Sequence, residues 1–488
     1  MNYSIIRNIL GKIMILMAFL MCLPIIFSVV YQEDLIYYIA FLIPVGLLFI
    51  IGKLFNLKKA ENTKMLAKEG FVIVGLTWLI IALFGCLPFI ISKANPNHFD
   101  AFFETCSGFT TTGASVVTDL TKLSHSLKFW RSFTHWIGGM GILVFILAII
   151  PESKEGTSIH ILRAESPGPQ VGKLVSKMQV TSRILYIIYL AFTILEFILL
   201  WAGPDKQMDF FNSLIYSIGT AGTGGLAIDP YSIEFYSAYS QYVIAIFMII
   251  FGINFTLFYL ILIGNLKEVV KNEEIKWYFS IILISITIIF ITLQVNNVYS
   301  TLELTFRHSL FQVASIISTT GYSSTNFDMW PSLAKCVILV LMVFGASAGS
   351  TAGGMKLSRI MILAKSTVKR IKNMINPRKI ETIYIDKKPI NDTISDSVQS
   401  YFVVYICILI ICTILISIDN FGLETNLTAS LACISNIGPG LGKVGPYGSY
   451  ADFSNFSKFI LSIEMIAGRL ELFPMLILFS PRTWKKRI

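Results

Sequence analysis

Ten long apolar runs divide the chain, and they constrain its fold more than any other feature of the sequence. Each run has the ~20 residues that an α-helix needs to cross a bilayer, or more. Helices satisfy all their backbone hydrogen bonds internally, so runs of this length predict transmembrane helices. The runs lie at residues 13–31, 35–55, 71–92, 130–150, 183–202, 237–264, 276–295, 332–365, 399–418 and 457–480.

The composition favours the same fold class. Hydrophobic residues make up 55% of the 488 residues and charged residues only 14%, whereas soluble domains average about 25% charged residues. The net charge of +10 is typical of nucleic-acid-binding proteins, but the basic residues lie in short segments between the apolar runs. We therefore expect an all-α polytopic membrane protein that binds no nucleic acid. A receptor-like signalling protein is disfavoured because no sizeable soluble domain is predicted.

The charges between the runs predict the orientation in the membrane. With the N-terminus inside, the inner segments hold 29 of the 39 Lys and Arg residues together with 12 acidic residues. The outer segments hold nine basic and 14 acidic residues. Because short cytoplasmic loops are enriched in Lys and Arg, both chain ends are expected in the cytoplasm.

Four shorter semi-apolar stretches lie between the runs. Each is too short to cross a bilayer and ends in a turn that contains glycine, which is typical of re-entrant half-helices surrounded by protein or water. With the flanking runs they form a weak fourfold internal repeat. The stretches lie at about 99–111, 209–220, 304–318 and 426–437. The expected organisation is two peripheral spans in residues 1–69 and four pseudo-symmetric span–hairpin–span units around one pore, in residues 70–182, 183–270, 271–398 and 399–488.

The four turns align on one glycine each, at Gly113, Gly224, Gly321 and Gly438. A dehydrated cation needs several oxygen dipoles, and rings of backbone carbonyls supply them without a fixed charge. Glycine permits the backbone conformation that turns carbonyls toward an axis, and the negative ends of the half-helix dipoles favour a cation there. The predicted K+ filter residues are Thr111, Thr112, Gly113, Gly222, Thr223, Gly224, Thr319, Thr320, Gly321, Asn436, Ile437 and Gly438. Close helix packing through small residues is the alternative, but it does not explain glycine at the ends of four such short segments.

The run that begins near Ser332 contains ten consecutive small residues, from Gly345 to Gly354. Each glycine in a helix costs about 0.8–1.0 kcal/mol relative to alanine. We expect a flexible intramembrane loop just below the filter, where it can obstruct the path and act as a gate. A close-packed kinked helix is the alternative. The glycines of the expected gate are Gly345, Gly349, Gly353 and Gly354.

Arg469 lies in the middle of the last run, where a charge costs about 2.5–3.5 kcal/mol. It could pair with Glu464 or Glu471, although neither lies three or four residues away along the helix. Alternatively, it faces the path below the filter, where it repels cations or bonds to the carbonyls of the 345–354 loop. Lys356, just after the loop, is either a further gate residue or an interfacial anchor.

The segment Gly345-Ala-Ser-Ala-Gly349 also matches the G-x-S-x-G pattern of a nucleophile elbow. An intramembrane serine protease is therefore a remote alternative. Such an enzyme requires a histidine base within reach of the serine. The five histidines fall at run ends or in loops, and only His135 could approach Ser347, from a different depth. We therefore expect no catalytic residues and no enzyme activity.

The four hairpins resemble those of the Trk/Ktr/HKT superfamily of potassium transporters, in which each repeat contributes a filter strand with a central glycine. Further motifs resemble the bacterial Trk-type membrane subunits, as do the two additional N-terminal spans. The resemblance covers essentially the whole chain. These motifs are Trp136-Ile-Gly-Gly-Met-Gly141, Leu162-Arg-Ala-Glu-Ser-Pro-Gly-Pro169 and Asn436-Ile-Gly-Pro-Gly-Leu-Gly442.

The resemblance implies selective K+ uptake across the bacterial cytoplasmic (inner) membrane, with K+ as the transported ion and no organic cofactor. In the superfamily, glycine at all four positions accompanies K+ selectivity, and serine in the first repeat accompanies Na+ permeation. A Na+ channel or a weakly selective cation channel stays an alternative, as does coupling of the flux to H+ or Na+.

The resemblance also implies a homodimer that works with a cytosolic, TrkA-like ring that binds nucleotide. The inner loop from Lys356 to Lys388 contains ten Lys and Arg residues. These residues offer a surface for such a regulator, or for anionic membrane lipid.

Overall fold

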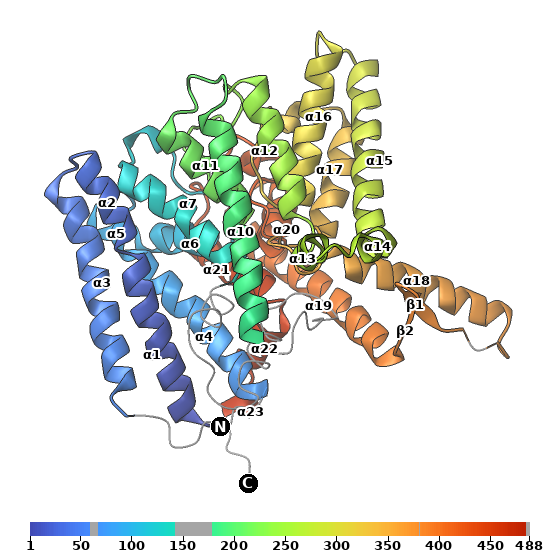
Figure 1. The fold of residues 1–488 in the computed structure, drawn as a ribbon, viewed down its shortest axis with the longest axis horizontal. Coiled ribbons are helices and arrows are strands. Elements are labelled where there is room, and N and C mark those ends of the chain that lie inside the picture. The colour runs from blue at the N-terminus through green and yellow to red at the C-terminus, as the bar shows by residue number, and fades with distance from the viewer. Residues whose placement is uncertain (59–66, 142–177, 380, 485–488) are drawn as a thin grey trace.

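The computed structural model describes residues 1–58, 67–141, 178–379 and 381–484. Within this part most residues are helical, and the only strands are β1 (Ile383–Ile385) and β2 (Lys388–Ile390), which form one hairpin (Figure 1). Six of the described helices are long and apolar enough to cross a membrane, or seven spans if one bent pair is counted as a single span. The prediction of an all-α membrane protein is confirmed.

The N-terminal helices form a separate layer at one side of the molecule (Figure 1). Helices α1 (Tyr3–Leu20) and α2 (Leu23–Val30) together make one span, and α3 (Leu35–Asn56) packs along α1. The two helices approach closely where Gly11 faces Gly52, since a Cβ added at either glycine would lie 2.8 Å from the carbonyl oxygen of the other. Small residues allow this contact between membrane helices.

Four short helices occupy the positions of the predicted half-helices. They are α6 (His98–Phe109), α11 (Phe210–Gly222), α16 (Leu302–Ile317) and α20 (Leu423–Ile434). A longer helix or pair of helices precedes each of them: α4 (Ala67–Gly85) with α5 (Leu87–Ile91), α10 (Met178–Trp201), α15 (Glu273–Val295) and α19 (Asp392–Ile416). A second helix follows each: α7 (His125–Gly139), α12 (Ala238–Phe251), α17 (Ser332–Phe344) and α21 (Asn455–Arg469).

The helix that follows each short helix packs against the next short helix along the chain. Thus α7 contacts α11, α12 contacts α16 and α17 contacts α20, while α21 returns to contact α6. The last of these contacts joins the end of the chain to its first third. The four units therefore interlock in a closed circle, and the turns that end their short helices come together at its centre.

Several of the predicted continuous spans are interrupted. In the predicted span 237–264, α12 ends at Phe251 and α13 (Phe255–Leu262) continues at an angle of 91°. In the predicted span 457–480, α21 ends at Arg469 and α22 (Phe473–Phe479) begins after three intervening residues. Glu471 and Leu472 between them adopt positive φ angles of 59° and 60°, which a helix cannot accommodate.

Two other predictions have different outcomes. In the predicted span 332–365, α17 ends at Phe344 and α18 (Leu357–Ile375) begins after a loop, so the expected break is present. The predicted span 130–150 begins within α7, but residues 142–150 lie outside the described part of the chain, as do residues 162–169 of the second quoted motif.

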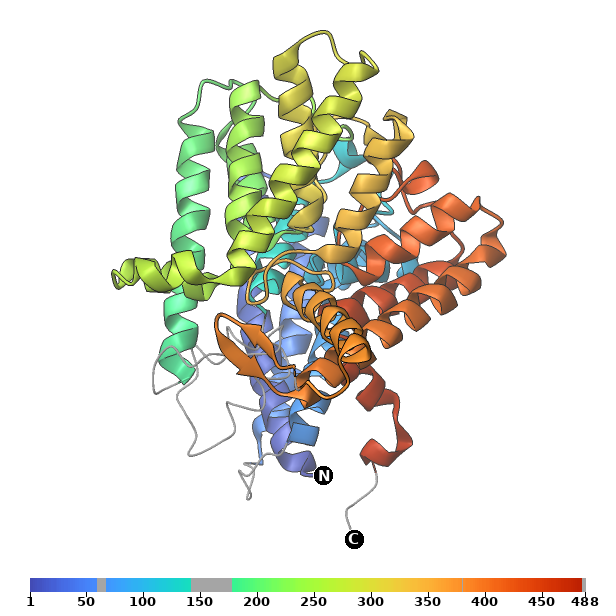
Figure 2. The same cartoon turned by 90° about the vertical axis from the view of Figure 1, so that its right-hand side faces the viewer.

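Helix α18 and the β1–β2 hairpin project from the body of the molecule (Figures 1 and 2). The described chain ends lie together at another place, because the Tyr3 hydroxyl donates a hydrogen bond of 3.2 Å to the carbonyl oxygen of Trp484. The remaining short elements are η1 (Leu120–Lys122), α14 (Leu266–Lys271), η2 (Phe327–Met329), η3 (Ser417–Asp419), η4 (Gly442–Val444) and α23 (Pro481–Trp484).

Candidate ion-binding site

Each short helix ends in a turn with the same backbone conformation. We call residues 110–113, 222–225, 318–321 and 435–438 the first, second, third and fourth turns. The second residue of each turn has a positive φ between 53° and 57°, and the fourth is a glycine with a positive φ between 69° and 100°. These residues are Thr111 and Gly113, Thr223 and Gly225, Thr319 and Gly321, and Asn436 and Gly438.

Backbone hydrogen bonds repeat with the same spacing. The N–H of the second residue bonds to the carbonyl oxygen three positions earlier, and the N–H of the third residue bonds to the carbonyl five positions earlier. In the first turn these bonds run from Thr111 to Gly108 and from Thr112 to Ser107, with lengths of 3.1 and 2.9 Å. The four turns are therefore structurally equivalent, residue by residue.

This equivalence corrects the predicted register of the second turn by one residue. The sequence alignment matched Gly222-Thr223-Gly224 with Thr111-Thr112-Gly113, whereas the structure matches Thr223-Gly224-Gly225 with them. Gly222 is the last residue of α11. Gly225 was missed because three of the four residues from 222 to 225 are glycine, so composition alone cannot show where the helix ends.

The four turns pack edge to edge in a ring. A Cβ added at Gly113 would lie 2.1 Å from the carbonyl oxygen of Gly224 in the second turn. The same distance, from an added Cβ to a carbonyl oxygen of the next turn, is 2.0 Å from Gly225 to Thr320 and 2.0 Å from Gly321 to Ile437. It is 2.7 Å from Gly438 back to Thr112. Each glycine thus leaves room for the carbonyl of the next turn, and the fourth turn closes the ring on the first.

Side chains reinforce the ring unevenly. The hydroxyls of Thr110 and Thr112 share a hydrogen bond of 2.8 Å, and the equivalent Ser318 and Thr320 share one of 2.7 Å. The Asn436 amide donates to the Thr112 hydroxyl at 3.0 Å, joining the fourth turn to the first. Gly224 and Ile437 occupy the corresponding third positions without a hydroxyl. The ring is therefore only approximately fourfold.

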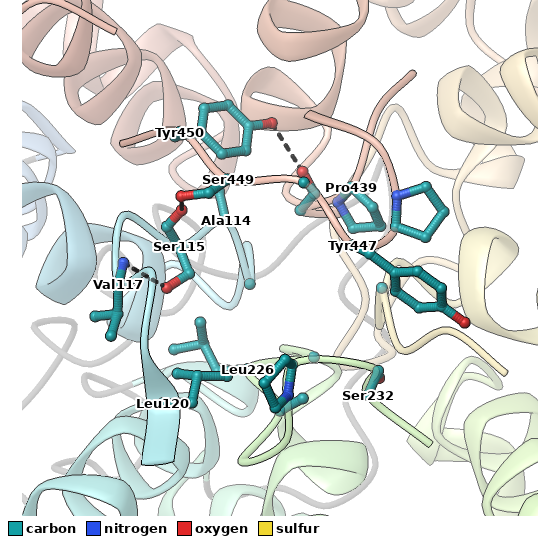
Figure 3. Close-up of a pocket in the computed structure, with 18 of the residues that line it drawn as sticks. Ala114, Ser115, Val117, Leu120, Leu226, Ser232, Pro439, Tyr447, Ser449 and Tyr450 are labelled. Carbon is teal, nitrogen blue, oxygen red and sulfur yellow. Dashed lines mark hydrogen bonds between the residues drawn. The ribbon is translucent and has the colours of Figure 1, made fainter. Parts of the chain in front are cut away.

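The four glycines line one cavity of about 320 Å³ (Figure 3). In Figure 3 the segments that follow the four turns surround it on different sides, and the Tyr450 hydroxyl donates to the Gly438 carbonyl oxygen at 2.8 Å. Two charged side chains, Arg131 and Asp229, are among the described lining residues. Asp229 accepts a hydrogen bond of 2.7 Å from the Tyr236 hydroxyl. The other described lining residues are uncharged and include both polar and apolar side chains.

The loop between α17 and α18 contacts the ring at the beginning of the turns. The N–H of Gly353 donates to the Thr319 hydroxyl at 2.7 Å, and a Cβ added at Gly353 would lie 2.5 Å from the Ser435 carbonyl oxygen. The cavity, in contrast, touches the glycines at the end of the turns. The loop and the cavity therefore lie on opposite sides of the ring.

The break between α12 and α13 anchors this loop. Ser347 N–H donates to the Gly252 carbonyl oxygen at 3.1 Å, and Phe255 N–H donates to the Gly349 carbonyl oxygen at 3.0 Å. The Ala348 N–H donates to Glu274 Oε1 at 2.7 Å. The bend that interrupts the predicted span 237–264 thus exposes the backbone groups to which the loop bonds.

Arg469 lies against the same loop. Its Nη1 donates to the Thr351 carbonyl oxygen at 2.9 Å, and its Nη2 donates to the carbonyls of Gly138 and Gly139 at 2.5 and 2.6 Å. The expected hydrogen bond to the loop is present. The two acidic residues considered as partners bond elsewhere, because Glu464 accepts from Ser430 and Glu471 pairs with Arg359.

Lys356 was considered as an interfacial anchor, and that interpretation is wrong. Its side chain is 3% exposed, and its ammonium group donates to the Ala352 carbonyl oxygen. Lys356 also adopts a positive φ of 72° directly before α18. Lys356 is therefore the buried last residue of the loop, and its side chain bonds back to the loop backbone.

Two buried histidines lie within helices, whereas the sequence placed all five at run ends or in loops. His135 lies inside α7, where Nδ1 is 2.7 Å from the Gly108 carbonyl oxygen and Nε2 accepts from the Leu226 N–H at 3.3 Å. His308 lies within α16 and contacts the Ser324 hydroxyl. Both ring nitrogens of His135 are engaged behind the first and second turns, which leaves neither available as a base for Ser347.

Comparison with known proteins gives a consistent result. The family model TrkH, described as a cation transport protein, matches residues 39–486. The Trk system potassium uptake protein TrkH of Escherichia coli K12 is 32% identical over 499 residues, and the match covers 100% of each chain. The Trk system potassium uptake protein TrkG of the same organism is 28% identical, with 99% of each chain covered. The crystal structure of the potassium transporter TrkH from Vibrio parahaemolyticus superposes with a TM-score of 0.89 at 28% identity, covering 99% of this chain and 100% of the other.

Proposed function

Because the chain belongs to the TrkH family of cation transport proteins, we propose that it takes up potassium ions selectively through the ring of four turns. Its relatives are named as potassium uptake proteins, so the chain belongs to a family of transporters rather than enzymes. The observation that carries the proposal is the closed contact from each turn to the next, in which every glycine accommodates a neighbouring carbonyl oxygen.

The ring suits a weakly hydrated cation for a physical reason. A K+ ion that leaves water needs several oxygen atoms at once, and backbone carbonyls provide them without the strong attraction of a fixed charge. In the corrected register the filter consists of Thr111, Thr112, Gly113, Thr223, Gly224, Gly225, Thr319, Thr320, Gly321, Asn436, Ile437 and Gly438. The cavity at the glycine side is then the entrance from which ions reach the filter.

The loop from Gly345 to Lys356 is the proposed gate. It contacts the third and fourth turns directly, and Arg469 holds its Thr351 carbonyl while also bonding to Gly138 and Gly139. A positive charge beside the path repels cations electrostatically. Opening then requires the loop and the Arg469 guanidinium to separate.

A reconstitution experiment tests this function. The purified protein is placed in vesicles, and uptake of K+ and Na+ is measured separately with and without a pH gradient across the membrane. We expect faster uptake of K+ than of Na+. Uptake that proceeds against the K+ gradient when a proton or sodium gradient is applied would identify coupled transport, and uptake that stops at equilibrium would identify channel-like flux. Equal permeation of uncharged solutes would refute a cation pathway.

The unevenness of the ring favours a second candidate, a cation channel of low selectivity. Gly224 and Ile437 lack the hydroxyls that Thr112 and Thr320 provide. The Gly438 carbonyl oxygen also accepts a hydrogen bond from the Tyr450 hydroxyl. The two turns that lack these hydroxyls are held less firmly, which makes a looser replacement for the hydration shell. A ratio of K+ to Na+ uptake close to one would favour this candidate.

The proposed setting is the cytoplasmic membrane of a bacterium, with both chain ends in the cytoplasm. The contact between Tyr3 and Trp484 supports the placement of both ends on one side. We further propose a homodimer and a cytosolic nucleotide-binding regulator, for which α18 and the β1–β2 hairpin offer a basic surface. Reporter fusions at each end and the mass of the purified complex with and without the regulator test these assignments.

A further inference from the structure

A buried ion pair lies behind the contact between the first and second turns. The Nη2 and Nε atoms of Arg131 both lie 2.8 Å from Glu104 Oε1, and the two side chains are 2% and 0% exposed. Glu104 belongs to α6, which leads into the first turn, and Arg131 belongs to α7. Neither residue stood out in the sequence, because they are separated by 27 positions.

The Glu104 carboxylate holds the segment that leaves the first turn. It accepts hydrogen bonds from the Ser115 hydroxyl, at 3.1 Å to each oxygen, and from the Val116 N–H at 3.0 Å. Ser115 lies two residues after Gly113. The Glu104 carboxylate thus helps to fix the direction in which the chain leaves the filter.

The Arg131 guanidinium connects this segment with the one that leaves the second turn. Its Nη2 donates to the Ser115 hydroxyl at 3.2 Å, and its Nη1 donates to the Ala227 carbonyl oxygen at 3.2 Å. Ala227 lies two residues after Gly225 and therefore corresponds to Ser115. A guanidinium presents its donors in a rigid plane, so it fixes the separation of two equivalent points.

The fourth turn is tied to the same place. The Tyr450 N–H and the Ser449 hydroxyl donate to the Ser115 carbonyl oxygen at 2.9 and 3.2 Å. Ser115 therefore bonds to Glu104, to Arg131 and to the segment that carries Tyr450, whose hydroxyl bonds to Gly438. A displacement of Ser115 would therefore shift groups bonded to the first, second and fourth turns.

We propose that Glu104 and Arg131 are positioning residues that set the spacing between the first and second turns, and through it the preference of the ring for K+ over Na+. The proposal rests on the proposed function of the ring as a filter. The contact that they support is tight, since a Cβ added at Gly113 would lie 2.1 Å from the Gly224 carbonyl oxygen. A small shift of either turn changes the distances between the oxygens that must replace the hydration shell of the ion.

A merely stabilising ion pair would behave differently. A buried pair often contributes little net stability, but removal of one partner leaves a charge without compensation in a low-dielectric interior. If the pair only stabilised the fold, its loss would lower the amount of active protein and leave the ratio of K+ to Na+ uptake unchanged. The ratio is measured on the same folded molecules for both ions, so it separates the two roles.

The test uses the full chain in vesicles and two variants of the pair. E104Q keeps the shape of the side chain but removes its charge, and R131K keeps the charge but loses the planar fork that reaches Ala227. We expect the K+/Na+ uptake ratio to fall about tenfold in E104Q, equivalent to about 1.4 kcal/mol of differential binding, and to fall also in R131K. If E104Q fails to fold, R131K alone decides the question.

D100N is the matched control, because Asp100 lies in the first turn of the same helix, at the end opposite the first turn of the ring, and forms an ion pair with Lys458 at 2.7 Å. We expect its uptake ratio to equal that of the unmodified protein. Unchanged ratios in E104Q and R131K, or an equal fall in D100N, would overturn the proposal. An unmodified protein that shows no preference for K+ would instead contradict the proposed function.

Discussion

The Nη1 atom of Arg469 donates a hydrogen bond of 2.9 Å to the carbonyl oxygen of Thr351, which lies 118 positions earlier in the chain. The same guanidinium bonds to the carbonyls of Gly138 and Gly139 at the end of α7. The Arg469 guanidinium thus joins the loop between α17 and α18 to α7 and to its own helix, α21. Such an arrangement holds the loop in place only while all three carbonyls stay within reach.

Replacement of Arg469 by alanine should raise the basal cation flux. The substitution removes both the hydrogen bond to the loop and the positive charge beside the proposed ion path, so a closed state that depends on them is weakened. Uptake of K+ into vesicles that contain the purified protein without any regulator measures this flux. Arg370→Ala is the control, since Arg370 is on α18 and bonds to Gln399 at 2.6 Å outside the loop. Unchanged or reduced flux in Arg469→Ala, at equal incorporation into the vesicles, would count against the gate.

Gly113→Ser should lower the preference for K+. Gly113 has a φ of 82°, and a Cβ there would lie 2.1 Å from the Gly224 carbonyl oxygen. The serine must therefore push the second turn away and strain its own backbone, at a cost of about 1–3 kcal/mol. We expect Na+ uptake to rise relative to K+ uptake in the same vesicles.

Gly46→Ser provides the comparison for this substitution, because no atom lies within 4 Å of a Cβ added at Gly46 in α3. Its uptake ratio should stay that of the unmodified protein. A K+ preference retained in full by folded Gly113→Ser protein would remove the first turn from the filter.

The sequence predicted the short helices well because two independent signals agree on them. Each combines an apolar stretch too short to cross a bilayer with a glycine-containing turn, and the four helices lie within a few residues of the predicted ranges. The loop from Gly345 was predictable for a similar reason, since a run of small residues cannot keep a helix rigid.

Other features depend on long-range contacts that a single sequence does not reveal. The bend after Phe251 lies in an apolar stretch without proline, and it is stabilised by hydrogen bonds to a loop almost 100 residues later. The register of the second turn depends on where α11 ends, and three neighbouring glycines make several answers possible. His135 resembled a residue at a run end, yet its two nitrogens bond to Gly108 and Leu226 in different units.

Thr319→Val should increase the basal flux by releasing the loop from the ring. The Thr319 hydroxyl accepts a hydrogen bond of 2.7 Å from the Gly353 N–H. Valine has nearly the same shape but no acceptor, which leaves a buried N–H unpaired at a cost of about 1–3 kcal/mol. The closed conformation of the loop is destabilised by that amount, so K+ uptake into vesicles without a regulator should rise several-fold.

Thr287→Val on α15 makes the same substitution away from the loop, because among the described residues the Thr287 hydroxyl bonds within its own helix alone, to the Leu283 carbonyl at 2.8 Å. Its flux should match that of the unmodified protein. Equal flux in both variants would show that the Thr319–Gly353 bond does not hold the loop closed.

Potassium itself should stabilise the folded protein against heat. Four turns with crowded carbonyl oxygens repel one another when no cation lies between them, and an ion that binds only the folded state adds stability that grows with the logarithm of its concentration. At about 100 times its dissociation constant the ion contributes about 2.7 kcal/mol. The melting temperature of the detergent-solubilised protein should therefore be higher in KCl than in NaCl or choline chloride at equal ionic strength. Gly113→Ser should lose most of this difference while Gly46→Ser keeps it. An identical melting temperature in KCl and choline chloride would mean that the folded ring holds no K+ at the concentrations used.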